Sequence, residues 1–128
     1  MAYKHRTLLI IDDNEDVSMI MALTLGNYGF TILEAADGEI GCRMAIEVLP
    51  CLILCDDQMP NLNGAQTLAR LKDTPATLNI PVLMFGGDGL QNEAIWRSRG
   101  ACGFIAKPFQ MTELRGKVDS ILSKVGGA

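Results

Sequence analysis

The sequence predicts an α/β fold, a doubly wound five-stranded parallel sheet of the (βα)5 type with helices on both faces. Along the 128 residues, short strand-like runs alternate five times with stretches of helical periodicity. The runs at 7–11 and 51–55 are apolar almost throughout, which is typical of strands that helices cover on both sides. Five βα units of roughly 25 residues, joined by right-handed crossovers, account for nearly the whole length.

Each unit supplies one strand and one helix. We expect strands at 7–11, 31–34, 51–55, 80–85 and 102–106, and helices near 15–28, 38–48, 65–72, 90–99 and 111–124. Asn14 or Asp13 is placed to cap the first helix. Asp37 with Gly38 opens the second helix, and Thr112 is placed to cap the last.

Two of these helices carry an apolar stripe, which predicts the face that is turned toward the sheet. The stripe of the last helix consists of Leu114, Val118, Ile121, Leu122 and Val125. The stripe of the first helix consists of Val17, Ile20, Met21 and Leu25. In the fourth helix, we expect one of the neighbours Ile95 and Trp96 to pack inward and the other to cover surface.

Length, charge and composition exclude several classes of function. A chain of this length predicts one domain, 1–128 with a core of about 6–125, and leaves no room for an effector domain. The net charge of −4 argues against direct binding to nucleic acid. Apolar runs are far shorter than the roughly 20 residues that cross a bilayer, and the start lacks a signal-peptide core. We therefore expect a cytoplasmic protein without membrane contact, whose four cysteines are reduced and buried.

Charged residues follow three of the expected strands. Asp12 and Asp13 come after the first strand, Asp56 and Asp57 after the third, and Lys107 after the fifth. In a doubly wound sheet these strand ends converge on one edge. Carboxylates about 4 Å apart repel by roughly 4 kcal/mol at an effective dielectric near 20, so three of them beside one lysine demand raised pKa values or a cation. Because a carboxylate can also attack a phosphoryl group, the pattern predicts Mg²⁺-dependent phosphoryl transfer.

Three segments in this order resemble a known family. They are Leu9–Asn14 (LIIDDN), Ile53–Gly64 (ILCDDQMPNLNG) and Phe104–Phe109 (FIAKPF). Together they are similar to the receiver domain of two-component response regulators, of the chemotaxis-regulator type, and the resemblance covers essentially the whole chain. It implies a flavodoxin-like sheet with the strand order 2-1-3-4-5.

The resemblance also implies the roles of the site residues. Asp56 is then the phosphoacceptor and one of the metal ligands. Asp13 is a direct ligand of Mg²⁺, or of Mn²⁺ in its place, whereas Asp12 acts on the metal through water. Gln58 contributes its backbone carbonyl to the metal, and Lys107 pairs with Asp56 or with its phosphoryl group.

Other positions follow or depart from the family pattern. Pro108 is a candidate for a cis peptide bond, and Phe104 falls at the aromatic switch position. Gly86 stands where the family has a Ser or Thr whose hydroxyl binds the phosphoryl oxygen, so phosphorylation chemistry can survive while its conformational readout is weakened. We expect Gly86→Thr to strengthen that readout. Asp57 and Asp88 are expected to be solvated loop carboxylates.

The implied function is a phosphoacceptor that catalyses its own phosphorylation and dephosphorylation without turning over an external substrate. Its partners would be a sensor histidine kinase or phosphotransfer protein, and a downstream protein. The downstream protein would bind the face of the fourth helix, fifth strand and fifth helix, where a partly exposed Trp96 would be a hint of contact. Two alternatives stay open: a receiver-like scaffold whose switching Gly86 weakens, and a phosphohydrolase of the haloacid dehalogenase type, which would want a carboxylate where Gln58 stands.

Overall fold

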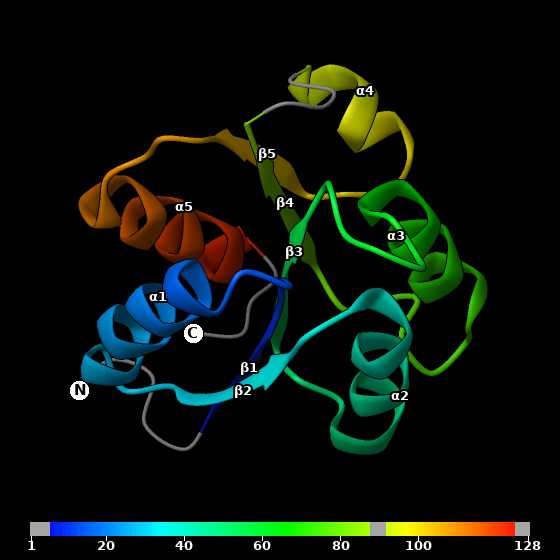
Figure 1. Cartoon of the computed structure of the whole chain (residues 1–128), viewed down its shortest axis with the longest axis horizontal. Helices are drawn as coiled ribbons and strands as arrows, with labels where there is room; N and C mark the ends of the chain where they lie inside the picture. The colour runs from blue at the N-terminus through cyan, green and yellow to red at the C-terminus, as the bar shows by residue number, and fades with distance from the viewer. Residues whose placement is uncertain (1–5, 88–91, 125–128) are drawn as a thin grey trace.

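The computed structural model describes residues 6–87 and 92–124, which form five strands and five helices in alternation (Figure 1). The elements are β1 (Thr7–Ile11), α1 (Glu15–Asn27), β2 (Thr31–Ala35), α2 (Gly38–Val48), β3 (Leu52–Asp56), α3 (Gly64–Asp73), β4 (Val82–Gly86), α4 (Glu93–Ser98), β5 (Gly103–Ala106) and α5 (Met111–Lys124). Each expected strand and helix is found, with small shifts at the ends. Residues 90 and 91 of the expected fourth helix lie outside the described ranges.

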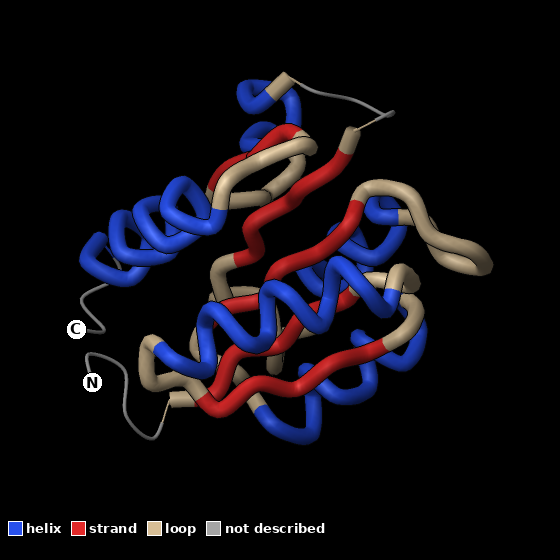
Figure 2. Tube along the Cα trace, turned by 60° about the vertical axis from the view of Figure 1, so that its left-hand side comes forward, coloured by secondary structure: helices blue, strands red, loops and turns tan. Residues whose placement is uncertain are grey.

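All five strands belong to one parallel sheet in the order β2-β1-β3-β4-β5, which confirms the predicted fold class and strand order (Figure 2). Ile10 of β1 lies opposite Glu34 of β2 on one side and opposite Leu54 of β3 on the other. The chain therefore winds outward in one direction to β2 and in the other direction through β3, β4 and β5. The reversal lies between the ends of β1 and β3, where a doubly wound sheet places its functional site.

Helices cover both faces of this sheet, α1 and α5 on one face and α2, α3 and α4 on the other (Figure 1). Leu8 and Ile10 of β1 pack in the core beneath α1 and α5. Leu9 and Ile11 pack in the core beneath the other three helices. Because successive side chains of a strand point to opposite faces, an unbroken apolar run is what a strand between two helical layers requires.

Side chains cap the helices that follow β1 and β2. The side chain of Asn14 accepts hydrogen bonds from the N–H groups of Asp16 and Val17, at 3.0 and 3.1 Å. Asp37 likewise accepts the N–H of Ile40 at 2.8 Å. Of the two candidates for the first cap, Asn14 takes the role, and Asp13 remains at the edge of the sheet.

The last helix begins at Met111, one residue before its predicted cap, so the prediction that Thr112 caps α5 is wrong. The N–H groups of Glu113 and Leu114 both donate to the carbonyl of Gln110, at 3.0 and 3.1 Å, which places Thr112 inside the first turn. The buried members of the apolar stripe are Leu114, Val118, Ile121 and Leu122, and Val125 lies outside the described residues.

The fourth strand starts later than expected, because the residues before it form a turn. The N–H of Ile80 donates to the carbonyl of Thr77 at 3.0 Å, and the ammonium group of Lys72 donates to the carbonyl of Ile80 at 2.7 Å. The strand runs from Val82 to Gly86, one residue beyond its expected end. Gly86 is thus the strand residue that meets the functional edge of the sheet.

The four cysteines carry free thiols, as predicted, but the prediction that all four are buried is wrong for two of them. Cys42 and Cys55 are buried, and Cys51 and Cys102 are half-buried. Burial raises the pKa of the Cys55 thiol well above its ordinary value, so this thiol is held in its neutral form. Within residues 6–87 and 92–124, the helices are too short or too polar to cross a membrane.

Candidate functional site

Three carboxylates meet at the edge where the winding reverses. Asp12 and Asp13 directly follow β1, and Asp56 is the last residue of β3. One oxygen atom from each carboxylate lies within 4.8 Å of the other two. Asp12 and Asp56 are buried, whereas Asp13 is exposed. The structure therefore brings together the acid pair and the aspartate that the sequence placed at neighbouring strand ends.

The buried member of the acid pair is only partly hydrogen-bonded. Oδ1 of Asp12 accepts the N–H of Asn14 at 3.0 Å, while Oδ2 is buried without a partner among the described residues. The pKa of Asp12 is raised from 3.8 to about 7, mainly by burial and also by Asp56, while the Asn14 N–H and Lys107 act in the opposite direction. An unpaired buried oxygen beside two more carboxylates is an environment that a hard divalent cation relieves. The donor set thus fits a metal ion with oxygen ligands.

Lys107 brings the positive charge to this edge. Its ammonium nitrogen lies 3.6 Å from Oδ2 of Asp56 and 5.1 Å from the centre of the Phe85 ring. The backbone N–H of Lys107 donates to the carbonyl of Gly86 at 2.8 Å, which joins the end of β5 to the end of β4. The Lys107–Pro108 peptide bond is cis. The side chain is therefore anchored at its backbone and directed at Asp56.

Asp57 lies in a different environment from the one that the sequence predicted, and the prediction of a solvated carboxylate is wrong. Asp57 is only 8% exposed, and both carboxylate oxygens are buried without a hydrogen-bond partner among the described residues. Burial, followed by the neighbouring charge of Asp56, raises the pKa of Asp57 from 3.8 to about 6. Asp88, the other acid expected to be solvated, lies outside the described residues.

The reason for this burial is the missing side chain at the end of β4. A Cβ atom on Gly86 would lie 2.6 Å from Oδ2 of Asp57 and closer still to Oδ1 and Cγ. The carboxylate of Asp57 therefore occupies the space that a side chain at position 86 would need. Sequence reasoning recognised the absent hydroxyl at Gly86, but no periodicity or spacing links position 86 to position 57.

Two further predicted positions lie beside the site. Gln58 is exposed, and its N–H lies 3.5 Å from Oδ1 of Asp56. Phe104 is buried and stacks on Trp96, with ring centres 6.4 Å apart and planes 8° from parallel. Trp96 is 2% exposed and Ile95 lies at the surface, which confirms that one of the two packs inward, and the buried Trp96 gives no hint of a partner surface. The outer side of the indole faces Arg99, whose guanidinium carbon lies 5.6 Å from the ring centre.

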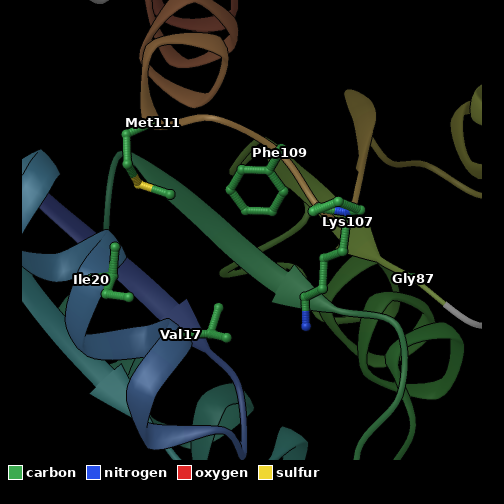
Figure 3. Close-up of a pocket in the computed structure, with 7 residues that line it drawn as sticks. Val17, Ile20, Gly87, Lys107, Phe109 and Met111 are labelled. Carbon is green, nitrogen blue, oxygen red and sulfur yellow. The ribbon is translucent and has the colours of Figure 1, made fainter.

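A hollow of about 480 Å³ adjoins Lys107 between α1 and the connection from β5 to α5 (Figure 3). Val17 and Ile20 line it from α1, and Phe109 and Met111 line it from the opposite side. Ile20 is 48% exposed, so the prediction that it packs in the core with the rest of its stripe is wrong. The first helix is apolar on several sides over residues 19–23, and periodicity alone does not decide which side faces inward.

A family model of the response regulator receiver domain matches residues 8–119, a range that contains each of these site residues. The chain belongs to the receiver domain family of two-component response regulators. PilG of Pseudomonas aeruginosa is 31% identical over 112 residues, which are 87% of this chain and 83% of PilG. The DNA-binding dual master transcriptional regulator RpaA of Synechocystis is 31% identical over 118 residues, which are 91% of this chain and 49% of RpaA. The receiver thus spans about half the length of RpaA and of similar curated relatives.

Solved structures agree with this assignment. One is a protein of Chloroflexus aurantiacus that is described as a response regulator. It has a TM-score of 0.86 and 32% identity, over 94% of this receiver and 99% of that chain. The receiver domain of NtrX from Brucella abortus has a TM-score of 0.83 and 26% identity, over 91% of this receiver and 98% of that chain. The chemotaxis protein CheY4 of Vibrio cholerae, at 24% identity and a TM-score of 0.83, shares the fold over 91% and 98% of the two chains.

Proposed function

We propose that this receiver accepts a phosphoryl group on Asp56 from the phosphohistidine of a sensor histidine kinase or phosphotransfer protein. Asp12, Asp13, Asp56 and the backbone carbonyl of Gln58 would hold Mg²⁺, or Mn²⁺ in its place. The observation that carries the proposal is the position of Asp56, which lies within 4.8 Å of both members of the acid pair and 3.6 Å from the ammonium group of Lys107.

The site residues have defined parts in this transfer. An oxygen of Asp56 attacks phosphorus, the new O–P bond replaces the N–P bond of the donor, and the departing imidazole nitrogen takes up a proton. The ammonium group of Lys107 balances charge on the transferred oxygens. A bound divalent ion supplies further neutralisation of these oxygens. Attack by water on phosphorus returns the free carboxylate, so the same site loads and unloads itself without an external substrate.

We place the output on the face formed by α4, β5 and α5, in contact with a downstream protein in the cytoplasm. Glu93 of α4 accepts the N–H of Phe104 in β5 at 3.2 Å and pairs with Lys117 of α5 at 3.5 Å. One acid therefore ties the three elements together. Because Lys107 directly follows β5, a displacement of this lysine toward a phosphoryl group would pull on the same strand.

The proposal is tested by intact mass after incubation with acetyl phosphate and Mg²⁺. We expect one phosphoryl adduct on the wild type and none on Asp56→Asn. An adduct on neither protein would favour the second candidate, a receiver-like scaffold that works without phosphorylation, which the buried Asp57 next to Asp56 and the absent hydroxyl at Gly86 support. Rapid turnover of many phosphoesters would instead indicate a phosphohydrolase, against which the Gln at position 58 argues.

A further inference from the structure

Asp57 is a buried acid that the proposed transfer does not use. Its N–H donates to the carbonyl of Phe85 at 2.9 Å, which extends the pairing of β3 with β4 by one residue. Its carbonyl accepts the N–H of Gly64, the first residue of α3, at 3.0 Å. The backbone of Asp57 is thus fixed by hydrogen bonds on both sides, so only its side chain can change position.

The side chain lies on the flank of Asp56 that is opposite to the metal cluster. β3 lies between β1 and β4 in the sheet, with the acid pair after β1 and Gly86 at the end of β4. Asp57 covers Gly86 and stays outside the cluster that unites the acid pair with Asp56. Asp56 therefore has carboxylates on both flanks.

The burial of the Asp57 carboxylate beside Asp56 destabilises the folded chain. A carboxylate that is buried without a hydrogen-bond partner, next to another carboxylate, is unfavourable and calls for an explanation in the function of the site. Asp57 lines a hollow of about 410 Å³ together with Asp13, Asp56 and Lys107. It also lines a second hollow of about 470 Å³, which Asp13 shares and which extends to Met59 and Asn63. The carboxylate oxygens are buried against Gly86, and a rotation of the side chain would bring them toward the second hollow.

We infer that Asp57 is a positioning residue that blocks the β4 flank of Asp56, and that its side chain turns toward Asn63 when Asp56 is phosphorylated. The inference rests on the proposed function, because the group that displaces Asp57 is the phosphoryl group on Asp56. The phosphoryl group and the neighbouring carboxylate of Asp57 both carry negative charge and repel each other, so Asp57 in its present place slows phosphoryl uptake. Because Asn63 caps α3, this rotation of the Asp57 side chain would transmit the phosphorylation of Asp56 to the start of that helix.

Rates of phosphoryl uptake test this inference. Intact mass follows adduct formation at pH 8 with saturating Mg²⁺ and acetyl phosphate, for the wild type, Asp57→Asn, Asp57→Ala and Asp73→Asn. Asp73 is an exposed residue at the end of α3, so its variant removes the same charge away from the site. We expect both Asp57 variants to load at least about threefold faster than the wild type, and Asp73→Asn to load at the wild-type rate.

The outcomes separate the inference from the proposed function. If the wild type loads and both Asp57 variants load no faster than it does, the inference is overturned and the proposed function stands. Absence of an adduct on every variant overturns the proposed function and the inference with it. Loading of the Asp57 variants but not of the wild type supports the inference that Asp57 blocks Asp56, and contradicts the proposed function, because the wild type then accepts no phosphoryl group.

Stability measurements test the placement of Asp57 without phosphorylation. We expect Gly86→Ala to lower the melting temperature by several degrees in the wild type, because the new Cβ and the Asp57 carboxylate compete for one space. In the Asp57→Ala background the same change should cost much less. Equal effects of Gly86→Ala in the two backgrounds would show that Asp57 does not occupy this space in solution.

Discussion

The ammonium nitrogen of Lys107 lies 3.6 Å from Oδ2 of Asp56, so one positive charge lies beside a group of carboxylates. Asp12 and Asp13 complete the cluster around Asp56, and Asp57 lies on its other flank. One lysine leaves most of this negative charge unbalanced within the folded chain. Stability and function are therefore opposed at this edge of the sheet, and the consequences are measurable.

Removal of the charge on Asp56 should stabilise the metal-free receiver. In Asp56→Asn the side chain keeps its shape but no longer repels the neighbouring carboxylates, so we expect the free energy of unfolding to rise by about 1 kcal/mol. Urea denaturation in the presence of a chelator measures the change. Asp73→Asn, which removes an exposed charge, serves as the control and should be nearly neutral. A less stable Asp56→Asn would mean that the pair with Lys107 outweighs the repulsion.

Divalent cation should stabilise the wild type through the same cluster. A ligand that binds only the folded state adds about 2.7 kcal/mol at a concentration 100 times its Kd. We expect MgCl₂ to raise the melting temperature of the wild type and to have little effect on Asp13→Asn, which loses the exposed carboxylate of the cluster. NaCl at matched ionic strength accounts for screening. Equal stabilisation of the two proteins by MgCl₂ would place the ion elsewhere.

The cluster itself was predictable from the sequence because it depends on connectivity. Asp12, Asp56 and Lys107 follow apolar strands, and the topology of a doubly wound sheet brings such strand ends together whatever the details of packing. The alternation of short apolar runs with helical stretches was sufficient for a doubly wound parallel sheet, and the resemblance of the motifs to the receiver family supplied the strand order. These features need no knowledge of where an individual side chain points.

Features that depend on side-chain direction were not predictable. Asp57 reads as a loop acid after a strand, and its burial follows from space left by a glycine 29 positions away in the chain, across a strand pairing. Trp96 and Ile95 are adjacent, and only the stack on Phe104 decides which of them faces inward. Thr112 illustrates the usual uncertainty of one or two residues at a helix end.

The raised pKa values of two acids predict an unusual dependence of stability on pH. The pKa values of Asp12 and Asp57 in the folded state are about 7 and about 6, above the ordinary 3.8. From about pH 4 to about pH 7 the folded chain therefore holds more protons than the unfolded chain, and this contribution to stability is lost as pH rises. One pKa unit corresponds to roughly 1.4 kcal/mol, so we expect a loss of more than about 1 kcal/mol in metal-free protein.

Urea denaturation at a series of pH values measures this loss. Asp12→Asn and Asp57→Asn should each flatten the fall between about pH 4 and pH 7, because each removes one of the two titrating groups. Saturating Mg²⁺ should flatten it as well, since a cation favours the ionised form of Asp12. Curves for the two variants that run parallel to the wild type would show that these acids titrate normally.

Restoration of a hydroxyl at the end of β4 should require two substitutions. The sequence alone suggests that Gly86→Thr strengthens the response to phosphorylation, but a side chain at position 86 overlaps the carboxylate of Asp57. We therefore expect Gly86→Thr by itself to destabilise the fold by about 1–3 kcal/mol, the usual cost of overpacking. In Asp57→Ala/Gly86→Thr the space is available, and the threonine hydroxyl can face a group on Asp56.

The response of the double variant is measured by amide chemical shifts with and without beryllofluoride, an analogue of the phosphoryl group. We expect shifts in β4 and Gly87 to be larger in Asp57→Ala/Gly86→Thr than in Asp57→Ala, because only the former offers a hydroxyl to the analogue. Asp57→Ala separates the effect of the hydroxyl from that of removing the acid. Identical shifts in the two variants would mean that a hydroxyl at position 86 does not contact the analogue on Asp56.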